Sequence, residues 1–312
     1  MSAWEDARAM CEPPRGWAVD CYLCGPRPLP TGTPIDDALG GGLMPGVTVL
    51  GGEASVGKSA LACHVASSVA ARGGRVLYLT LDDSWGNVVS RCMSAWSVTH
   101  ARDWGGRPFS WSALPSMRHD LRPMRTSDPT RDAFELRRAD DALMASAHWE
   151  DGPAVSLAIV DSVTDVPTIE RMLRDMADEG ELPELVVVDY VQQYQSGEPE
   201  IDRGEYSRVS EVAARLQRLS LWGGFPLLML SSLKKLSKQE RDDAPTLDWF
   251  RGSGVVGYSA WAACVLTRGT AEGPGWREAV LHGVKKKGGS AQTEHPLKVW
   301  GAYSYAERMG DE

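Results

Sequence analysis

The sequence predicts an α/β fold in which a mostly parallel sheet is flanked by helices on both faces. Two observations lead to this class. Apolar runs rich in Val, Leu and Ile recur along the chain, and such near-continuous apolar runs are typical of strands buried in a parallel sheet. Helix-like segments separate these runs, and strand–helix alternation indicates a doubly wound α/β layer. No internal repeat is present.

Seven segments have the composition of buried strands, and three longer segments have that of helices. The predicted strands are residues 47–50, 75–81, 157–160, 185–189, 226–231, 262–267 and 279–284. The predicted helices are residues 59–71, 166–179 and 206–221.

Residues 85–151 interrupt this alternation. The segment combines several prolines and many charges with a broadly helical pattern, and its tryptophans are Trp96, Trp104, Trp111 and Trp149. We expect an elaboration that packs its aromatic side chains on the domain. Stacking of these rings on nucleic acid is the alternative.

The 312 residues suffice for one large domain or two modest ones. Residues 1–29 are rich in Pro, Gly and Cys, with one short helical candidate at 2–10, and are predicted to form an arm or linker before a domain at 30–312. The net charge of −9 argues against an indiscriminate cationic nucleic-acid binder but allows local basic patches.

With no run of about eighteen apolar residues and no secretory signal at the N-terminus, we expect a cytoplasmic protein without a membrane span.

Three of the six cysteines lie in this N-terminal arm, at positions Cys11, Cys21 and Cys24. The last two have the spacing of a zinc knuckle, and Cys11 offers a third ligand. A structural zinc site needs about four ligands, and no nearby His or Cys completes the set. We therefore expect reduced thiols and keep zinc as the alternative.

The segment GGEASVGKS, residues 51–59, lies between a predicted strand and a predicted helix. It fits the phosphate-loop (Walker A) pattern G-x-x-x-x-G-K-[ST] in the strand–loop–helix context that the pattern requires. Glycines let successive backbone N–H groups point inward, and the helix N-terminus adds a positive dipole end. Lys58 is expected to reach the β- and γ-phosphates of a nucleoside triphosphate, and Ser59 to ligate Mg²⁺. The predicted phosphate-binding residues are Gly52, Glu53, Ala54, Ser55, Val56, Gly57, Lys58, Ser59 and Ala60.

Two further strand ends carry carboxylates. Asp189 ends the predicted strand 185–189, where a Walker B aspartate orients the Mg²⁺ shell. Asp82 and Asp83 follow another strand, and the carboxyl ends of parallel strands line the ligand crevice. A carboxylate there can act as general base on the attacking water, and we choose Asp82 over Asp83 because it lies at the strand end. The alternative for all of these residues is an aspartate that caps or forms a turn.

Five segments in order resemble motifs of a known family. They are TGTPIDDALGGGL at 31–43, DYVQ at 189–192, LSSL at 230–233, RGSG at 251–254 and VKKKGG at 284–289. Together with the phosphate loop they resemble the RecA-like ATPase domain of DnaB-type replicative helicases and, more distantly, the RadA/Sms branch of the same superfamily. The resemblance implies a RecA-like P-loop NTPase fold that uses ATP and Mg²⁺, and a homo-oligomer, expected to be a hexameric ring, that acts on single-stranded DNA.

The resemblance also implies roles for individual residues. Asp82 takes the place of the glutamate that activates water in such helicases, and it is one methylene shorter. Ser232 stands where the family has a glutamine that senses the γ-phosphate. Lys287 aligns with the arginine finger that reaches a neighbouring subunit in trans, with Lys285 as its companion, and lysine keeps the charge but loses the bidentate fork. These departures point to slower or differently coupled hydrolysis. The alternative for residues 285–287 is a solvated basic run.

By position, the two loops that face the central pore of such rings are residues 193–206 and 234–249. The second carries a cluster suited to phosphate contact, namely Lys234, Lys235, Lys238 and Arg241. The first is mainly acidic and is a poor DNA contact. A solvated surface of mixed charge is the alternative for both loops.

The sequence therefore favours an ATP-hydrolysing, helicase-type motor on single-stranded DNA, with replication or mobile-element proteins as partners. A nucleotide-switched assembly or scaffold protein with slow hydrolysis is the alternative from a different class. A RadA-like repair ATPase is the third possibility.

Overall fold

The computed structural model describes residues 26–103, 106–112, 148–237, 239–240, 243–251, 257, 259–289 and 292–310. The predicted helix at 2–10 and the arm cysteines Cys11, Cys21 and Cys24 lie outside these residues. So do Trp104, Lys238 and Arg241. The predicted division at residues 29 and 30 stays a prediction.

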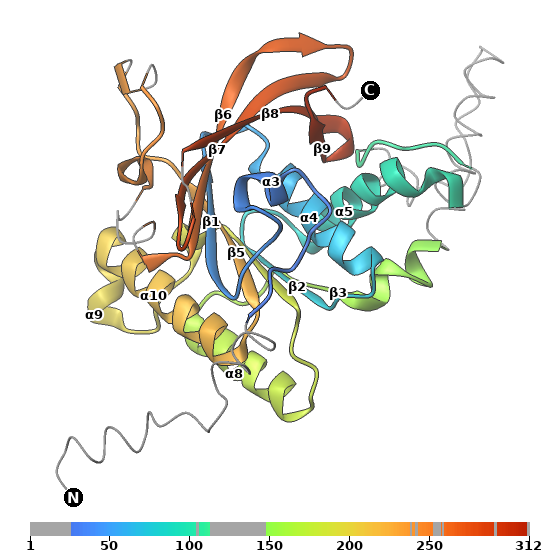
Figure 1. The fold of residues 1–312 in the computed structure, drawn as a ribbon. Coiled ribbons are helices and arrows are strands. Elements are labelled where there is room, and N and C mark those ends of the chain that lie inside the picture. Colours follow the sequence, from blue (N-terminus) through green and yellow to red (C-terminus); the bar gives the residue numbers. More distant parts are fainter. Residues whose placement is uncertain are drawn as a thin grey trace, which may run out of the picture.

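The described chain forms a nine-stranded sheet in the order β3-β2-β4-β5-β1-β6-β7-β8-β9 (Figure 1). Neighbours from β3 to β6 pair in parallel, and neighbours from β6 to β9 pair antiparallel. The strands are β1 (Gly46–Gly52), β2 (Val76–Thr80), β3 (Leu157–Val160), β4 (Leu185–Asp189), β5 (Pro226–Ser232), β6 (Ala262–Gly273), β7 (Trp276–Lys286), β8 (Thr293–Trp300) and β9 (Tyr305–Arg308). The mostly parallel sheet is confirmed. All seven predicted strands are present, whereas β8 and β9 were not predicted.

Helices cover both faces of this sheet (Figure 1). Successive strand residues point to opposite faces, so the sheet divides its apolar side chains between two cores. One core joins α4 and α5 to β2 and β4 through residues such as Leu61, Trp96 and Val187. The other joins α8 and α10 through residues such as Ile169 and Leu216. The helices are α3 (Ile35–Leu39), α4 (Lys58–Ala71), α5 (Trp85–His100), α8 (Val166–Asp178), α9 (Pro199–Asp202) and α10 (Glu205–Gly223).

The strand register brings distant sequence motifs to one edge of the sheet. Gly52, at the end of β1, pairs with Ser232 at the end of β5. Thr80, at the end of β2, pairs with Asp189 at the end of β4. Parallel strands end at the same edge of a sheet. One rim of the sheet therefore carries the phosphate loop, Ser232, Asp189 and the Asp82–Asp83 pair that follows β2.

Part of the described stretch of residues 85–151 packs on the sheet. Helix α5 begins after Ser84, whose hydroxyl accepts a hydrogen bond from the Asn87 backbone N–H. Trp96 and Trp149 are 5% and 4% exposed, and their rings meet edge to face with centroids 5.6 Å apart. Their burial leaves little ring surface for stacking on nucleic acid.

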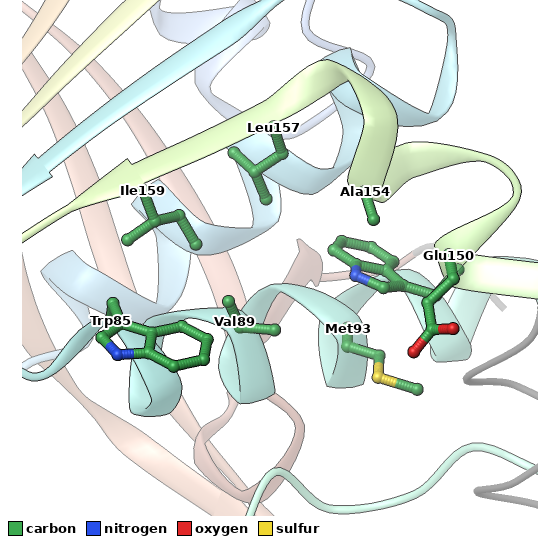
Figure 2. A pocket seen from close by; sticks show the side chains of 8 residues that line it. Trp85, Val89, Met93, Glu150, Ala154, Leu157 and Ile159 are labelled. Carbon is green, nitrogen blue, oxygen red and sulfur yellow. The ribbon is translucent and has the colours of Figure 1, made fainter.

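A cavity lies beside the edge strand β3. Figure 2 shows apolar side chains of α5 and β3 pointing towards one another across a cavity of about 310 Å³. Its lining residues are Trp85, Val89, Met93, Trp149, Glu150, Ala154, Leu157 and Ile159. Within the described residues, no helix is both long enough and apolar enough to cross a membrane.

Candidate functional site

The chain turns tightly between β1 and α4. Ser55 and Gly57 adopt positive φ values of 60° and 117°. A Cβ on Gly52 would lie only 2.9 Å from the Leu266 carbonyl oxygen, so a larger residue would force the loop away from β6. The turn leads into the N-terminus of the 14-residue helix α4. The unpaired N–H groups and the positive dipole end of such a helix favour an anion, so the turn is a candidate anion-binding site.

Lys58 lies at the start of α4 with its ammonium folded back on the loop. Its Nζ donates hydrogen bonds to the carbonyl oxygens of Gly52 and Glu53, each at 2.8 Å. Burial lowers the pKa of Lys58, and the nearby carboxylates of Asp189, Asp82 and Glu53 oppose that shift. The ammonium is therefore held at the mouth of the loop, close to both strand-end acids.

Asp189 is 4% exposed at the end of β4. The Tyr78 hydroxyl donates a hydrogen bond to its Oδ2 at 3.0 Å, and the Ser59 side chain also hydrogen-bonds to it. Burial raises the pKa of Asp189, whereas these two hydrogen bonds lower it. One hydroxyl and one carboxylate fit Mg²⁺, which is held by few protein ligands and completes its shell with water and phosphate oxygens. Among the described residues, no cluster of three or more His, Cys, Asp or Glu side chains could hold a metal ion.

Asp82 and Asp83 have different surroundings. Asp83 accepts hydrogen bonds from the Asn87 side chain at 2.6 Å and the Ser84 backbone at 2.9 Å, and it pairs with Arg91 at 3.2 Å. Asp82 is exposed to the cavity and accepts a hydrogen bond from Gln193 Nε2 at 3.2 Å. Asp83 is thus used in holding the start of α5, while Asp82 faces the space where a reactant could lie.

A cavity of about 490 Å³ gathers most of the predicted site residues. Those that line it are Ala54, Ser55, Gly57, Lys58, Ser59, Ala60, Asp82, Asp189 and Ser232. The hydroxyls of Ser232 and Ser304 are buried in its wall and have no hydrogen-bond partner in the described part of the chain. A polar ligand would satisfy both hydroxyls, so the residues present fit a magnesium–nucleotide complex.

Six further residues line this cavity, and none of them was predicted as a site residue. They are Arg91, Trp111, Tyr190, Arg277, Gly301 and Ser304. Arg277 on β7 donates a hydrogen bond to the Ser55 carbonyl oxygen. The Arg91 guanidinium lies 4.6 Å from the centre of the Trp111 ring, and Trp111 Nε1 donates to the Gly301 carbonyl at 3.1 Å. Tyr190 lies in the DYVQ segment, and Trp111 was expected to pack on the domain. No sequence motif signals Arg91, Arg277, Gly301 or Ser304, because they reach the cavity only when the chain folds.

Lys285 and Lys287 are not brought to this cavity. Lys286 pairs with Ala262, which is level with Thr48 near the start of β1. Gly52 lies four residues further along β1, or about 13 Å at about 3.3 Å per residue. Lys287 is exposed, and the Lys285 ammonium donates to the Gly257 carbonyl at 2.9 Å. Lys287 therefore lies away from the phosphate loop of its own chain.

The two predicted DNA loops leave from the same rim. Gln192 Nε2 donates to Ser231 Oγ at 2.8 Å and to the Arg251 carbonyl at 3.0 Å, so it ties the base of one loop to the base of the other. Lys234 pairs with Glu240 at 2.9 Å, which offsets part of the basic cluster. Lys235 is exposed to solvent.

The parallel sheet, the glycine-rich turn and the strand-end acids define a RecA-like α/β fold. The chain matches the solved ATPase domain of G40P with a TM-score of 0.70 at 16% identity, over 90% of each chain. It also matches a DnaB-like replicative helicase, whose structure is described together with its interactions with primase, with a TM-score of 0.69 at 17% identity. That match covers 90% of this chain and 61% of the helicase. At these identities the likeness shows the fold.

Residues 132–292, just over half of the chain, match the family model of the DnaB-like helicase C terminal domain. The chain belongs to this family. It is also 47% identical over 73 residues to the DNA repair protein RadA of Mycobacterium tuberculosis, and 47% identical over 64 residues to RadA of Mycolicibacterium smegmatis. The first match spans 23% of this chain and 15% of RadA, and the second spans 20% and 14%.

Proposed function

We propose that the chain is an ATP-hydrolysing, helicase-type motor that works on single-stranded DNA as a ring. The observation that carries this proposal is the convergence of Lys58, Ser59, Asp82 and Asp189 on one cavity at the carboxyl edge of the sheet. Family membership supports the class of activity. A glycine-rich turn alone would serve any phosphate, whereas this set also offers a metal ligand pair and a separate carboxylate for water.

In the proposed mechanism, the backbone N–H groups of residues 53–58 bind the phosphates of ATP. The Lys58 ammonium leaves the Gly52 and Glu53 carbonyls and takes the β- and γ-phosphate oxygens. Mg²⁺, when bound, supplies neutralising charge between these oxygens and would be held by Ser59 and Asp189. Asp82 orients the attacking water and accepts its proton. Trp111 and Arg91 offer a flat wall for the nucleoside.

Ring assembly is proposed because Lys287 lies too far along the sheet to serve its own phosphate loop. In a ring, Lys287 of one copy, with Lys285 beside it, would approach the γ-phosphate bound by the next copy. We take the ring to be hexameric. The Gln192 hydrogen bonds give the nucleotide rim a direct link to both DNA loops. Lys234 and Lys235 are the described cations available there for single-stranded DNA.

The test is ATP turnover with and without single-stranded DNA, together with the mass of the protein bound to a non-hydrolysable ATP analogue. The motor proposal expects a several-fold stimulation by DNA and a ring-sized complex. A nucleotide-switched assembly protein with slow hydrolysis is the second candidate, favoured by the Lys234–Glu240 ion pair that weakens the DNA loop. Intact nucleotide binding without stimulation would support this second candidate.

A further inference from the structure

We propose that Tyr78 is a positioning residue that holds Asp189 in the orientation needed for the magnesium–nucleotide complex. This inference rests on the proposed function, because it assumes that Asp189 serves Mg²⁺. Tyr78 lies in the middle of β2, directly beside β4, and pairs in register with Val187, two residues before Asp189. Its side chain is fully buried.

The Tyr78 hydroxyl is set between two side chains. It donates to Asp189 Oδ2 at 3.0 Å. On its other side, the Cys63 thiol of α4 donates to the Tyr78 oxygen at 3.9 Å. Because an ionised carboxylate can only accept, the phenol's own proton is directed to Asp189, and the phenol oxygen can still accept from the Cys63 thiol.

The Cys92 thiol also lies near the Tyr78 hydroxyl, and the ring itself is part of an apolar core. The ring lies in the same core cluster as Leu61, Val187 and Leu228. Phenylalanine would fill this space without a buried hydroxyl that needs a partner, so packing alone does not account for a tyrosine here. The contact with Asp189 does account for it.

The contact has a consequence for metal binding. A carboxylate at the end of a strand can rotate about its Cβ–Cγ bond, and a hydrogen bond from the core to Oδ2 fixes that rotation. The carboxylate is then held in one orientation at the cavity, where the Ser59 side chain also hydrogen-bonds to it. Hydrogen-bond partners of this kind behind a metal ligand typically change metal affinity by about 10-fold to 100-fold when they are removed.

The test compares Tyr78→Phe with the matched control Tyr194→Phe. Tyr194 is also fully buried, and its hydroxyl has no hydrogen-bond partner among the described residues. Binding of a fluorescent ATP analogue is titrated with Mg²⁺, and binding without metal and the thermal unfolding midpoint are measured alongside. Tyr78→Phe should raise the Mg²⁺ concentration for half-maximal binding by about 10-fold. Metal-free binding should stay unchanged, and Tyr194→Phe should match the wild type in the Mg²⁺ titration and in metal-free binding.

Asp189→Asn separates failure of this inference from failure of the proposed function. If Asp189→Asn shifts the Mg²⁺ dependence and Tyr78→Phe does not, the positioning role is wrong and the metal assignment stands. If Tyr78→Phe weakens metal-free binding as much as Mg²⁺-dependent binding, its effect is general and the positioning role is again overturned. If Asp189→Asn leaves the Mg²⁺ dependence unchanged, the proposed metal site itself fails.

Discussion

Replacing Asp82 by Asn should remove hydrolysis while leaving nucleotide binding in place. The substitution keeps the shape of the side chain, and the amide oxygen can still accept the hydrogen bond that Gln193 donates to Asp82. It removes the group that would take a proton from water. A positioned general base typically contributes about 10²-fold to 10⁴-fold in rate, so turnover should fall by that factor, equivalent to about 3–5 kcal/mol on the barrier. Phosphate release at saturating ATP and Mg²⁺ measures the rate, and a fluorescent nucleotide measures the affinity.

Asp83→Asn is the matched control on the adjacent residue. The Asp83 carboxylate pairs with Arg91; the Asp83 side chain is 23% exposed and the Arg91 side chain is 25% exposed. Losing this partly screened ion pair should lower the free energy of unfolding by about 0.5–1 kcal/mol and leave turnover close to that of the wild type. Full turnover in Asp82→Asn, or its loss in Asp83→Asn alone, would refute the assignment of the general base.

Two other outcomes test the fold and the assembly. Burial lowers the pKa of His64 to about 3, so below pH 6.5 the unfolded chain binds a proton that the folded chain does not, and stability falls as pH falls. Urea titrations between pH 6 and pH 4 measure how steeply the free energy of unfolding depends on pH. His64→Gln should lower that slope by about 1.4 kcal/mol per pH unit. Identical slopes in the two proteins would mean that His64 is protonated in the folded chain. Lys287→Ala should slow turnover only in the assembled protein, so the rate per chain should match the wild type at dilutions where single chains prevail. A defect that persists at those dilutions would exclude action in trans.

The sequence predicted the central strands because both of their faces are buried. Residues 185–189 coincide with β4, in which every residue is buried. Residues 157–160 coincide with β3, an edge strand that is partly exposed but is still marked by an apolar run. The antiparallel strands β8 and β9 escaped prediction because their residues alternate between buried and partly exposed positions, and Pro296 lies within β8. Beyond Thr267, β6 likewise continues with alternating exposure as half of a ribbon, which a search for buried runs does not detect.

The site divides in the same way. Asp82 and Asp189 could be found in the sequence because each follows a buried strand, and parallel strands end at one edge. Tyr78 and Arg277 could not. Tyr78 is a single aromatic residue inside a buried strand, so the sequence gives no sign of its role. Its hydroxyl contacts Asp189, which lies 111 residues later in the chain. Arg277 reaches the loop from 222 positions away and depends on the curvature of the β6–β7 ribbon.

The placement of the cations bears on whether this domain is a motor or a switch. Arg277 holds the phosphate-loop backbone from within the same chain, whereas Lys287 follows the opposite end of β7, away from that loop. One strand therefore has a cation at or next to each end, and in the proposed ring Lys287 would serve the loop of a neighbouring copy. A nucleotide that tightens the loop around Arg277 would also pull on β7 and so on Lys287. In the proposed ring, this arrangement would couple the occupancy of one site to the contact offered to the next, as a ring whose sites hydrolyse ATP in sequence requires.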